Sequence, residues 1–349
     1  MSGGVDSSVA AALMKEQGCE CAGVTLELYG TAEGAAGSAT SSVAGSVEDA
    51  KQAARLLGMT HDTIEFTEVF KNEVIYRFIQ TYESGGTPNP CIDCNRHIKF
   101  NMTLLKTKGL DFDILATGHY AKIERDASGR LLLKKAADLK KDQSYVLYSL
   151  SQDQLLHTCF PLGGLSKNEV RELANGYGFF NADKADSQDI CFVPDGDYGS
   201  FMENYTGKSY PEGDILDTGG KTIGRHRGIV RYTLGQRRGL GVAVNTPVYV
   251  TAKDMAANTI TLGEESYLYS KYLFARNINL IACDSIDKPL CCNVRTRYLQ
   301  QEKPAVVEQT GPDEFRVDFN DQNGQRAVTP GQAVVLYDGD VVIGGGTIC

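Results

Sequence analysis

Long apolar runs are absent from this sequence of 349 residues. The run Val9–Met14, for example, is followed at once by Lys15 and Glu16, and it falls short of the ~18 residues that a membrane-spanning helix needs. No basic leader precedes it, so it lacks the pattern of a signal peptide. We therefore expect a cytoplasmic protein that has no membrane partner.

An excess of positive charge is also absent. Lys and Arg number 35 against 44 Asp and Glu, and the net charge of −9 excludes a chain wrapped entirely by nucleic acid. Ten cysteines are few for a disulfide scaffold of this length, and without an export signal we expect reduced thiols. Five of them have the surroundings of small core residues: Cys19, Cys21, Cys159, Cys283 and Cys349. The sequence contains no internal repeat.

Residues 1–200 alternate between helical and strand patterns. The predicted helices are 8–17, which ends at Gly18, and 46–57, which starts with a capping box from Ser46 to Asp49 and ends at Gly58. The predicted strands are 22–28, 63–66 and 113–120, and 30–45 is predicted to be a soft, low-complexity loop. This alternation is typical of an α/β domain with a doubly wound parallel sheet, in which ligands bind at the carboxyl ends of the strands.

Short β runs replace the helices after residue 200. Residues 334–346 are predicted to form a hairpin, because two β-branched runs flank Asp338–Gly339. Together with runs at 293–298, 305–310 and 315–319, this hairpin predicts a small antiparallel β-barrel over residues 269–349. We expect residues 201–268 to form a separate, irregular central domain.

The segment SGGVDSS at residues 2–8 leads directly into the first predicted helix. Glycines let the backbone approach a ligand, serine hydroxyls add donors, and the helix directs its positive end at the same place, which predicts a phosphate or pyrophosphate site. The segment lacks the lysine of G-x-x-x-x-G-K-[ST], which excludes the usual kinase-type loop. The alternative is a Gly-Ser turn with a serine or aspartate helix cap. The pattern resembles the pyrophosphate loop of ATP-cleaving adenylyltransferases.

The segment GGTPNPCIDCNRHIKF at residues 85–100 carries two thiols at C-x-x-C spacing. Its glycines and prolines predict a rigid, exposed loop before Cys91 and Cys94. Arg96, His97 and Lys99 follow closely, and we expect these cations to lower the thiol pKa and favour the thiolate. The alternatives are two inert thiols or a structural metal site. A closed zinc site usually needs four ligands, and the sequence has no second C-x-x-C.

A third stretch, DSQDICFVPDGDYGSF at residues 186–201, contains Cys191, which taken alone has the surroundings of a core cysteine. Together the three stretches resemble one family, the bacterial tRNA-specific 2-thiouridylases, which thiolate the wobble uridine of tRNA. The motifs that carry this resemblance span essentially the whole chain: SGGVDSS (2–8), TPNPC-x-x-C-N-x-x-IKF (87–100), ATGHYA (116–121), KDQSYVLY (141–148), S-x-x-ICF (187–192), TLGQRRGLG (233–241), RTRY (295–298) and TPGQAVVLY (329–337).

The resemblance implies that ATP and Mg²⁺ bind at the pyrophosphate loop, with Asp6 helping to place the metal. The implied ATP-binding residues are Ser2, Gly3, Gly4, Val5, Asp6, Ser7, Ser8, Leu26 and Gly118. It further implies that uracil O2 is adenylated and that Cys191 carries a persulfide, loaded by a cysteine desulfurase or a persulfide relay protein. Cys94 is the implied nucleophile, which either attacks Cys191 to release the sulfur or forms a Cys94–Cys191 disulfide as the thiolated base departs.

Cys91 departs from the family pattern, because many members have Asp at this position. That Asp would be a base or would position one, and a thiol acts differently. An alternative is that Cys91, Cys94 and Cys191 hold an iron–sulfur cluster with one open iron site, since such clusters favour thiolate ligands.

The segment 221–239 concentrates positive charge without a single acid. Its cations are Lys221, Arg225, Arg227, Arg231, Arg237 and Arg238, and they predict a local phosphate-binding face, the alternative being a solvated charge run. The resemblance adds expected tRNA contacts at Asn89, Pro90, Cys91, His119, Lys141, Asp142, Gln143, Arg297, Tyr298 and Gln332. The wobble uridine is expected near Asn89 and Pro90, in tRNAs for Glu, Gln and Lys.

The predicted function is therefore that of an ATP-dependent tRNA-uridine 2-sulfurtransferase. The competing interpretations are a small-molecule ATP pyrophosphatase or ligase, and a catalytically silent tRNA-binding or sulfur-carrier protein. A pyrophosphate loop normally follows a strand in the middle of the sheet. We therefore also expect a short apolar strand upstream of Met1 in the native protein.

Overall fold

A computed structural model describes the chain except for residues 30–38, 110–111, 183, 185–189 and 244–245, and for residues 39–44 and 107–108 it describes the backbone alone. The structure divides into two compact units. The first unit contains residues 1–74, 91–194 and 339–343, and the second contains residues 75–90, 195–338 and 344–349. The three-domain division expected from the sequence stays a prediction.

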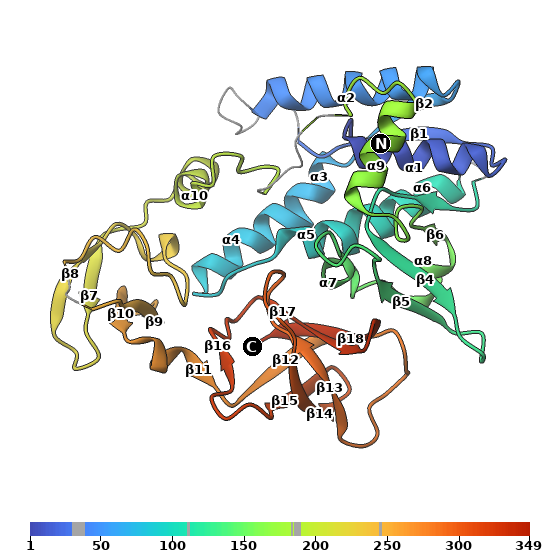
Figure 1. Ribbon diagram of the computed structural model, residues 1–349. Coiled ribbons are helices and arrows are strands. Elements are labelled where there is room, and N and C mark those ends of the chain that lie inside the picture. The colour runs from blue at the N-terminus through green and yellow to red at the C-terminus, as the bar shows by residue number, and fades with distance from the viewer. Residues whose placement is uncertain (30–38, 110–111, 183, 185–189, 244–245) are drawn as a thin grey trace. The chain divides into compact units, whose positions relative to one another are not determined.

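Helices are interspersed with short strands over the first 200 residues (Figure 1). In chain order these elements are α1 (Val5–Glu16), β1 (Ala22–Glu27), α2 (Ala39–Leu56), β2 (Thr60–Glu65), α3 (Thr67–Phe70), the π-helix η1 (Lys71–Ile75), α4 (Tyr76–Glu83), α5 (Pro90–Asp93), the π-helix η2 (Cys94–Met102), α6 (Thr103–Lys108), β3 (Leu115–Ala116), β4 (Ala121–Arg125), β5 (Leu131–Lys135), α7 (Ser144–Leu147), α8 (Gln152–Leu156), β6 (Thr158–Cys159), α9 (Lys167–Gly176) and α10 (Tyr198–Thr206).

Strands dominate the rest of the chain. They are β7 (Gly213–Leu216), β8 (Thr222–His226), β9 (Tyr249–Asp254), β10 (Thr259–Gly263), β11 (Tyr269–Ser270), β12 (Tyr272–Leu280), β13 (Leu290–Arg295), β14 (Lys303–Gly311), β15 (Glu314–Phe319), β16 (Gln325–Arg326), β17 (Ala333–Asp338) and β18 (Val341–Ile348), with short 3₁₀ turns η3 (Ile229–Arg231) and η4 (Glu265–Leu268).

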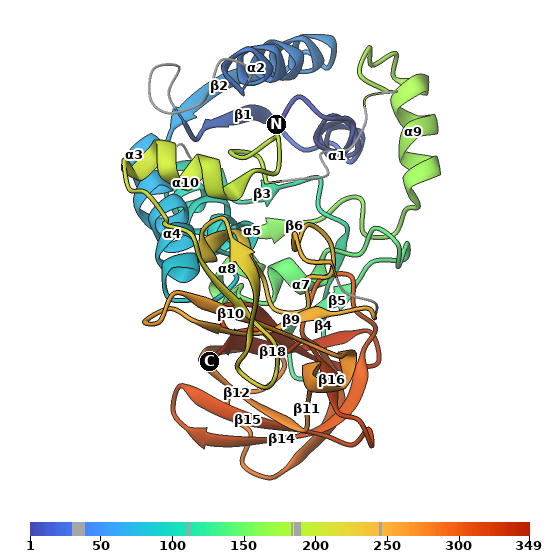
Figure 2. The same ribbon diagram turned by 90° about the vertical axis from the view of Figure 1, so that its left-hand side faces the viewer.

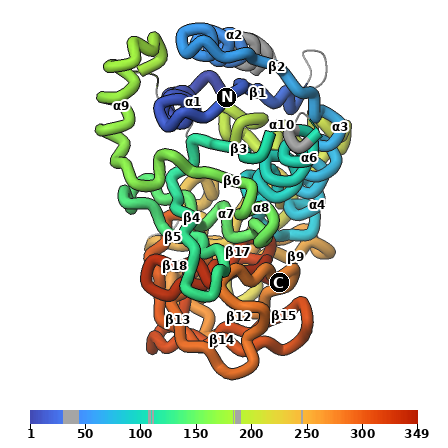
Figure 3. The backbone as a smooth tube through the Cα atoms, turned by 90° about the vertical axis from the view of Figure 1, so that its right-hand side faces the viewer, coloured from blue at the N-terminus to red at the C-terminus, as the bar shows by residue number. Residues whose placement is uncertain are grey.

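The first unit contains two parallel strand pairs, as the sequence predicts, and also the antiparallel pair of β4 and β5. β1 runs parallel to β2, with Ala22 opposite Thr60, and β3 runs parallel to β6, with Leu115 opposite Thr158. Within the described residues these strands make two separate pairs. Figure 3 shows α2 along the β1–β2 pair, and α1 beside α9.

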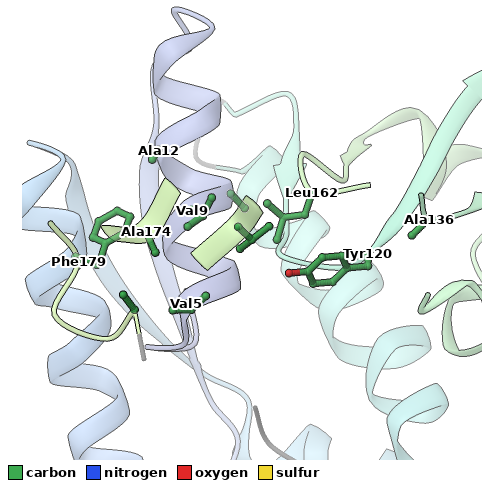
Figure 4. Close-up of a cluster of buried hydrophobic side chains, with 12 residues drawn as sticks. Val5, Val9, Ala12, Tyr120, Ala136, Leu162, Ala174 and Phe179 are labelled. Carbon is green, nitrogen blue, oxygen red and sulfur yellow. The ribbon is translucent and has the colours of Figure 1, made fainter. Parts of the chain in front are cut away.

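The core of the first unit is built on α1. Val5, Val9 and Ala12 are buried at a spacing of four and three residues, which places them on one face of the helix. Figure 4 shows this face packed against Ala174 and Phe179 on one side and against Leu162 and Tyr120 on the other. Small side chains at this contact let α1 and α9 approach closely, which fixes the start of α1 relative to the start of α9.

Two helix starts differ from their predictions. α1 begins at Val5 instead of residue 8, so Asp6, Ser7 and Ser8 lie in its first turn. α2 begins at Ala39, so Ser46 lies inside the helix and does not cap it, and residues 39–45 are helical where a loop was predicted. Residues 30–38 of that predicted loop lie outside the described residues. The predicted ends at Gly18 and Gly58 are confirmed, since both glycines adopt left-handed backbone with φ of 82° and 62°.

The second unit contains the antiparallel barrel that the sequence predicts. Six strands follow one another in the order β12, β15, β14, β13, β17 and β18, and the pairing of β12 with β18 closes the ring. Figure 2 shows β12, β15 and β14 side by side in this order. Alternate residues of β15 are buried, as a barrel wall requires. The predicted hairpin is confirmed as β17 and β18, and Gly339 supplies the positive φ of its turn.

The central segment is more regular than predicted. β7, β8, β9 and β10 form one sheet in the order β8-β7-β10-β9, in which β7 and β10 are parallel. Ile215, Val250 and Ile260 are fully buried in this unit.

Among the described helices of the chain, none has the length and apolarity needed to cross a membrane.

Candidate active site

The segment at residues 2–8 forms a tight turn into α1. Gly3 has φ of 70°, and a Cβ built there would lie 2.2 Å from the carbonyl oxygen of Ser46, so only glycine fits. The backbone nitrogen of Ser2 donates to Ser7 Oγ at 3.0 Å, and Ser7 and Ser8 hydroxyls donate to the Gly4 carbonyl at 3.1 and 3.2 Å. Hydroxyls and the first amides of α1 thus gather at one point, as an anion site requires.

Gly118 brings a second segment against this loop. A Cβ on Gly118 would lie 2.7 Å from the carbonyl carbon of Asp6 and 2.8 Å from the nitrogen of Ser7. Gly118 follows β3, and Leu26 stands next to the last residue of β1. Both predicted ATP-binding positions therefore lie at the carboxyl ends of parallel strands, where α/β folds bind ligands.

The carboxylate of Asp6 is held by two residues that the sequence reasoning missed. Lys167 Nζ lies 2.7 and 2.9 Å from the two carboxylate oxygens, and the Tyr120 hydroxyl donates to Oδ1 at 2.8 Å. Lys167 is buried, with 6% of its surface exposed. It lies 161 residues after Asp6, so no local motif could reveal the pair, although the Ser166–Glu169 capping box does fix the helix start beside it.

Two further side chains reach the loop from the segment after α9. Asn181 Nδ2 donates to the Gly3 carbonyl at 3.1 Å. Lys184 Nζ pairs with Asp49 at 2.8 Å and lies 3.4 Å from the same carbonyl. Lys184 is much more exposed than Lys167, with 43% of its side chain in contact with solvent.

The thiols implicated by the sequence come together in the first unit. Cys94 is buried, whereas Cys91 and Cys191 keep exposed surface. Burial raises the pKa of the Cys94 thiol to about 11. Although Cys91 and Cys191 keep exposed surface as whole residues, the surrounding protein removes water from their thiols and raises the pKa of both. The neighbouring thiols Cys94 and Cys91 raise the pKa of Cys191 further, which shows that the three lie close enough for their charges to interact.

The expectation that nearby cations lower the thiol pKa is wrong for Cys94, because burial outweighs them. Lys99 does act in the expected direction on Cys94, but more weakly than burial. Arg96 instead donates to the Tyr148 hydroxyl at 3.5 Å, and His97 lies 3.8 Å from Glu73.

Tyr29 is a further residue that the sequence reasoning missed. It follows β1, and its hydroxyl donates to the Cys191 carbonyl oxygen at 3.2 Å. Its ring packs against Phe70 at 5.9 Å between centroids, and Phe70 packs edge-on against Phe192 at 5.6 Å. A hydrogen bond from Tyr29 also lowers the pKa of the Cys191 thiol, against the larger opposing effect of burial. The aromatic contacts anchor the Cys191 segment beside β1, while residues 187–189 of its motif lie outside the described residues.

The thiols do not form a metal centre in the structure. Among the residues that the structure describes, no group of three His, Cys, Asp or Glu side chains is placed to hold a metal ion. The geometry of Cys91, Cys94 and Cys191 therefore gives no support to the iron–sulfur alternative.

Several of the expected tRNA contacts hold the first unit together. Both oxygens of Asp142 are used internally, since Oδ1 accepts from the Ala136 nitrogen at 3.0 Å and Oδ2 accepts from the Ser144 hydroxyl at 2.8 Å. Gln143 Oε1 accepts from the Tyr120 nitrogen at 3.0 Å. Burial lowers the pKa of His119 well below its usual value, so this imidazole is neutral at pH 7. Lys141 is half-buried beside them.

In the second unit, the turn at residues 329–332 forms hydrogen bonds to the loop that leads to Asn89 and Pro90. Gln332 Nε2 donates to the carbonyls of Thr87 and Pro88 at 2.9 and 3.0 Å, and the Thr87 nitrogen donates to the Pro330 carbonyl at 2.8 Å. Gly331 must be glycine, because a Cβ there would lie 2.5 Å from Thr81 Cγ2 and its φ is 85°. Gln332 therefore orders a loop of the predicted uridine site.

Arg297 also has an internal role. Its guanidinium donates to the carbonyls of Leu234 and Ala327 at 3.0 and 3.3 Å and to the Thr329 hydroxyl at 2.7 Å. Both Arg297 and Tyr298 are half-buried.

The cations of the basic segment 221–239 fall into two groups, those that form ion pairs and those that form none among the described residues. Arg225 contacts Glu212 and Asp214 at 3.6 and 3.2 Å, and Arg231 contacts Asp197 and Glu203 at 2.7 and 2.8 Å. The exposed cations with no ion pair among the described residues are Lys221, Arg227, Arg237 and Arg238. Fewer cations are therefore available for the predicted phosphate-binding face than the sequence indicated.

Comparison with known proteins places the whole chain among relatives. Residues 1–195 match the family described as tRNA methyl transferase HUP domain, residues 199–264 match the tRNA methyl transferase PRC-barrel domain, and residues 270–348 match the aminomethyltransferase beta-barrel domain. The α/β unit and the closed barrel agree with these matches.

Curated relatives cover the chain from end to end. A protein of Halothermothrix orenii named tRNA-specific 2-thiouridylase MnmA is 47% identical, over 100% of this chain and 97% of the relative. Proteins with the same name from Clostridioides difficile and Symbiobacterium thermophilum are 45% and 47% identical, over 100% of this chain and 96% and 90% of theirs. A solved structure, a predicted subunit of tRNA methyltransferase from Methanocaldococcus jannaschii, aligns over 50% of this chain and 72% of its own at 19% identity and a TM-score of 0.29, which is too weak to carry an argument.

Proposed function

This chain belongs to the family of tRNA-specific 2-thiouridylases, and we propose on that basis that it catalyses the ATP-dependent 2-thiolation of the wobble uridine of tRNA. The observation that carries the proposal is the presence, in one compact unit, of an anion-binding loop and of two thiols, Cys94 and Cys191, that are distant in sequence and close in space. A small-molecule ligase would need the loop but not the thiols.

The first proposed step activates the uracil. The loop at residues 2–8 holds the ATP phosphates, with Leu26 and Gly118 beside the nucleotide. Uracil O2 attacks the α-phosphorus, pyrophosphate leaves, and AMP remains on O2 as a good leaving group. The amides at the start of α1 and the serine hydroxyls stabilise the negative charge of the phosphates.

Asp6 fits a Mg²⁺ ion that arrives with ATP better than a resident metal. Because no set of three ligands exists among the described residues, phosphate oxygens and water would complete the coordination. Bound Mg²⁺ supplies charge that offsets the departing pyrophosphate. In the structure both Asp6 oxygens contact Lys167, so the carboxylate already faces a cation.

The second proposed step transfers sulfur. The outer sulfur of a persulfide on Cys191 attacks C2 of the uracil. The C2–O2 bond then breaks, and AMP departs with the O2 oxygen. Cys94 then attacks the inner sulfur, forming a Cys94–Cys191 disulfide and leaving the outer sulfur on the base, and a thiol reductant restores the pair. In the alternative order, Cys94 attacks first and releases the sulfur that then reacts with C2.

Cys91 enters this scheme as a neutral group. Burial raises the pKa of its thiol, so it is protonated at pH 7 and unlike the Asp of many family members. We propose that it contacts the uridine or Cys94 as a weak hydrogen-bond donor and does not act as a base. Asn89 and Pro90, which precede it directly, would contact the uridine, and His119 would do so as a neutral imidazole.

The phosphates of the tRNA backbone would bind the cations that form no ion pair within the described part of the chain. Arg227, Arg237 and Arg238 are exposed and suited to phosphate contacts. The same proposal assigns anticodon-loop contacts to Lys141, Arg297, Tyr298 and Gln332, and tRNAs for Glu, Gln and Lys as substrates. A cysteine desulfurase or a persulfide relay protein would load Cys191.

The test is nucleoside mass spectrometry of unmodified tRNA after incubation with the protein, ATP, Mg²⁺ and a persulfide donor. Formation of 2-thiouridine that needs both ATP and the donor supports the proposal. AMP release without tRNA, and without any dependence on Cys94 or Cys191, would instead favour a small-molecule ligase.

A further inference from the structure

Lys167 supplies a charge that the loop at residues 2–8 lacks in its own sequence. Phosphate loops with the G-x-x-x-x-G-K-[ST] motif carry their lysine within the loop, whereas SGGVDSS has none. The ammonium of Lys167 lies against the first turn of α1 through its contacts of 2.7 and 2.9 Å with Asp6.

The fold holds Lys167 in place from several directions. Its backbone nitrogen donates to Asp138 Oδ2 at 3.1 Å, and the Ser166–Glu169 capping box fixes the helix start at this residue. Val170 and Ala174 then pack α9 against α1. The side chain therefore projects from a rigid support toward the loop.

Lys167 occupies a position that disfavours a lone positive charge, and its contacts with both Asp6 oxygens offset this effect. It is the first residue of α9, where the helix dipole disfavours a positive charge. Its side chain is only 8% exposed, so the ammonium has also lost most of its water. Lysine is normally disfavoured at the start of a helix and in the interior. A departure from such a preference at a rigid, buried position is typical of a residue kept for function.

We infer that Lys167 is a catalytic residue that contacts the phosphates of ATP and the departing pyrophosphate. This inference rests on the proposed ATP-dependent function and names the cation that the loop itself does not provide. Lys184 is the weaker candidate, because it is more exposed and its ammonium pairs with Asp49, outside the loop. A preorganised, nearly dehydrated cation stabilises the charge that develops as pyrophosphate leaves.

The decisive experiment is calorimetric titration of the tRNA-free protein with inorganic pyrophosphate, ATP and adenosine. The variants are Lys167→Met, Lys167→Gln and, as a control on the exposed face of the same helix, Arg171→Met. Loss of one charged contact should weaken pyrophosphate and ATP binding by roughly 10- to 100-fold. Adenosine affinity should be unchanged, and Arg171→Met should behave as the wild type.

A purely structural role predicts a different pattern. Loss of a partner for Asp6 would lower stability, and it would not separate pyrophosphate from adenosine. If Lys167→Met does not fold, Lys167→Gln decides, because its amide can still donate to Asp6 without carrying charge.

Wild-type affinity for pyrophosphate in a folded Lys167→Gln protein would overturn the inference while leaving the proposed function intact. If the wild-type protein itself bound neither ATP nor pyrophosphate, both would fail.

Discussion

Burial of Cys94 predicts that this thiol is a poor nucleophile until substrate arrives. Its pKa of about 11 compares with about 8.5 for a cysteine in an unfolded chain. At pH 7.5 the difference means roughly 300-fold less thiolate in the folded protein. A thiolate of higher pKa is intrinsically more nucleophilic, by roughly tenfold over this range, so alkylation should be about 20- to 30-fold slower than in the unfolded chain.

The assay is iodoacetamide labelling of native and urea-unfolded protein from pH 7 to 10.5. Fragment-ion mass spectrometry separates Cys94 from Cys91, which share one tryptic peptide. Restricted access of iodoacetamide to the buried thiol slows labelling equally at every pH. The shape of the plot of labelling rate against pH therefore reports the thiol pKa alone. The native rate at Cys94 should rise about tenfold per pH unit through pH 10. A plateau at Cys94 near pH 9 in the native protein would refute the reasoning.

Three further predictions concern Tyr29, Gln332 and Arg238. Tyr29→Phe removes a hydrogen bond that lowers the pKa of the Cys191 thiol, so alkylation of Cys191 should slow and stability should fall by about 1 kcal/mol. Gln332→Ala removes two hydrogen bonds to the loop at residues 85–90, so amide hydrogen exchange at Thr87 should accelerate even without tRNA. Arg238→Gln removes an exposed cation, so the slope of log affinity for tRNA against log salt should decrease in size by about 1.

Each prediction has a matched control. Cys94 should label at an unchanged rate in Tyr29→Phe, and an equal slowing there would point to general disturbance of the site. Gln332→Glu should disturb the loop more than Gln332→Ala, because it sets a carboxylate against two carbonyls; the opposite order would contradict the hydrogen bonds described. Arg225→Gln should change the salt slope less than Arg238→Gln, because Arg225 is paired with Asp214.

The sequence predicted the features that depend on neighbours along the chain. Gly18 and Gly58 mark the helix ends, and Asp338–Gly339 marks the hairpin that closes the barrel. These signals work because turn chemistry needs particular backbone angles that few residues adopt. The start of α2 escaped prediction, because an Ala- and Ser-rich stretch carries no strong signal for either helix or loop.

The sequence could not reveal features that arise from tertiary packing. Cations next to Cys94 in sequence suggested a lowered thiol pKa, whereas burial, which is a property of the folded protein, raises it. Lys167 and Tyr120 reach Asp6 from distant segments, and Gly118 is required by a contact with the first turn of α1. Expected tRNA contacts such as Asp142 and Gln143 carry internal hydrogen bonds, which a motif does not distinguish from ligand contacts.

The central claim is that Cys94 and Cys191 act together with ATP to place sulfur on tRNA. The most direct measurement is 2-thiouridine formed by the wild type and by Cys94→Ser, Cys191→Ser and, as a control in β6, Cys159→Ser, with ATP and a persulfide donor. The account predicts 2-thiouridine from the wild type and the Cys159→Ser control, and none from the other two variants. Undiminished product from Cys191→Ser, or no product from the wild type, would contradict it.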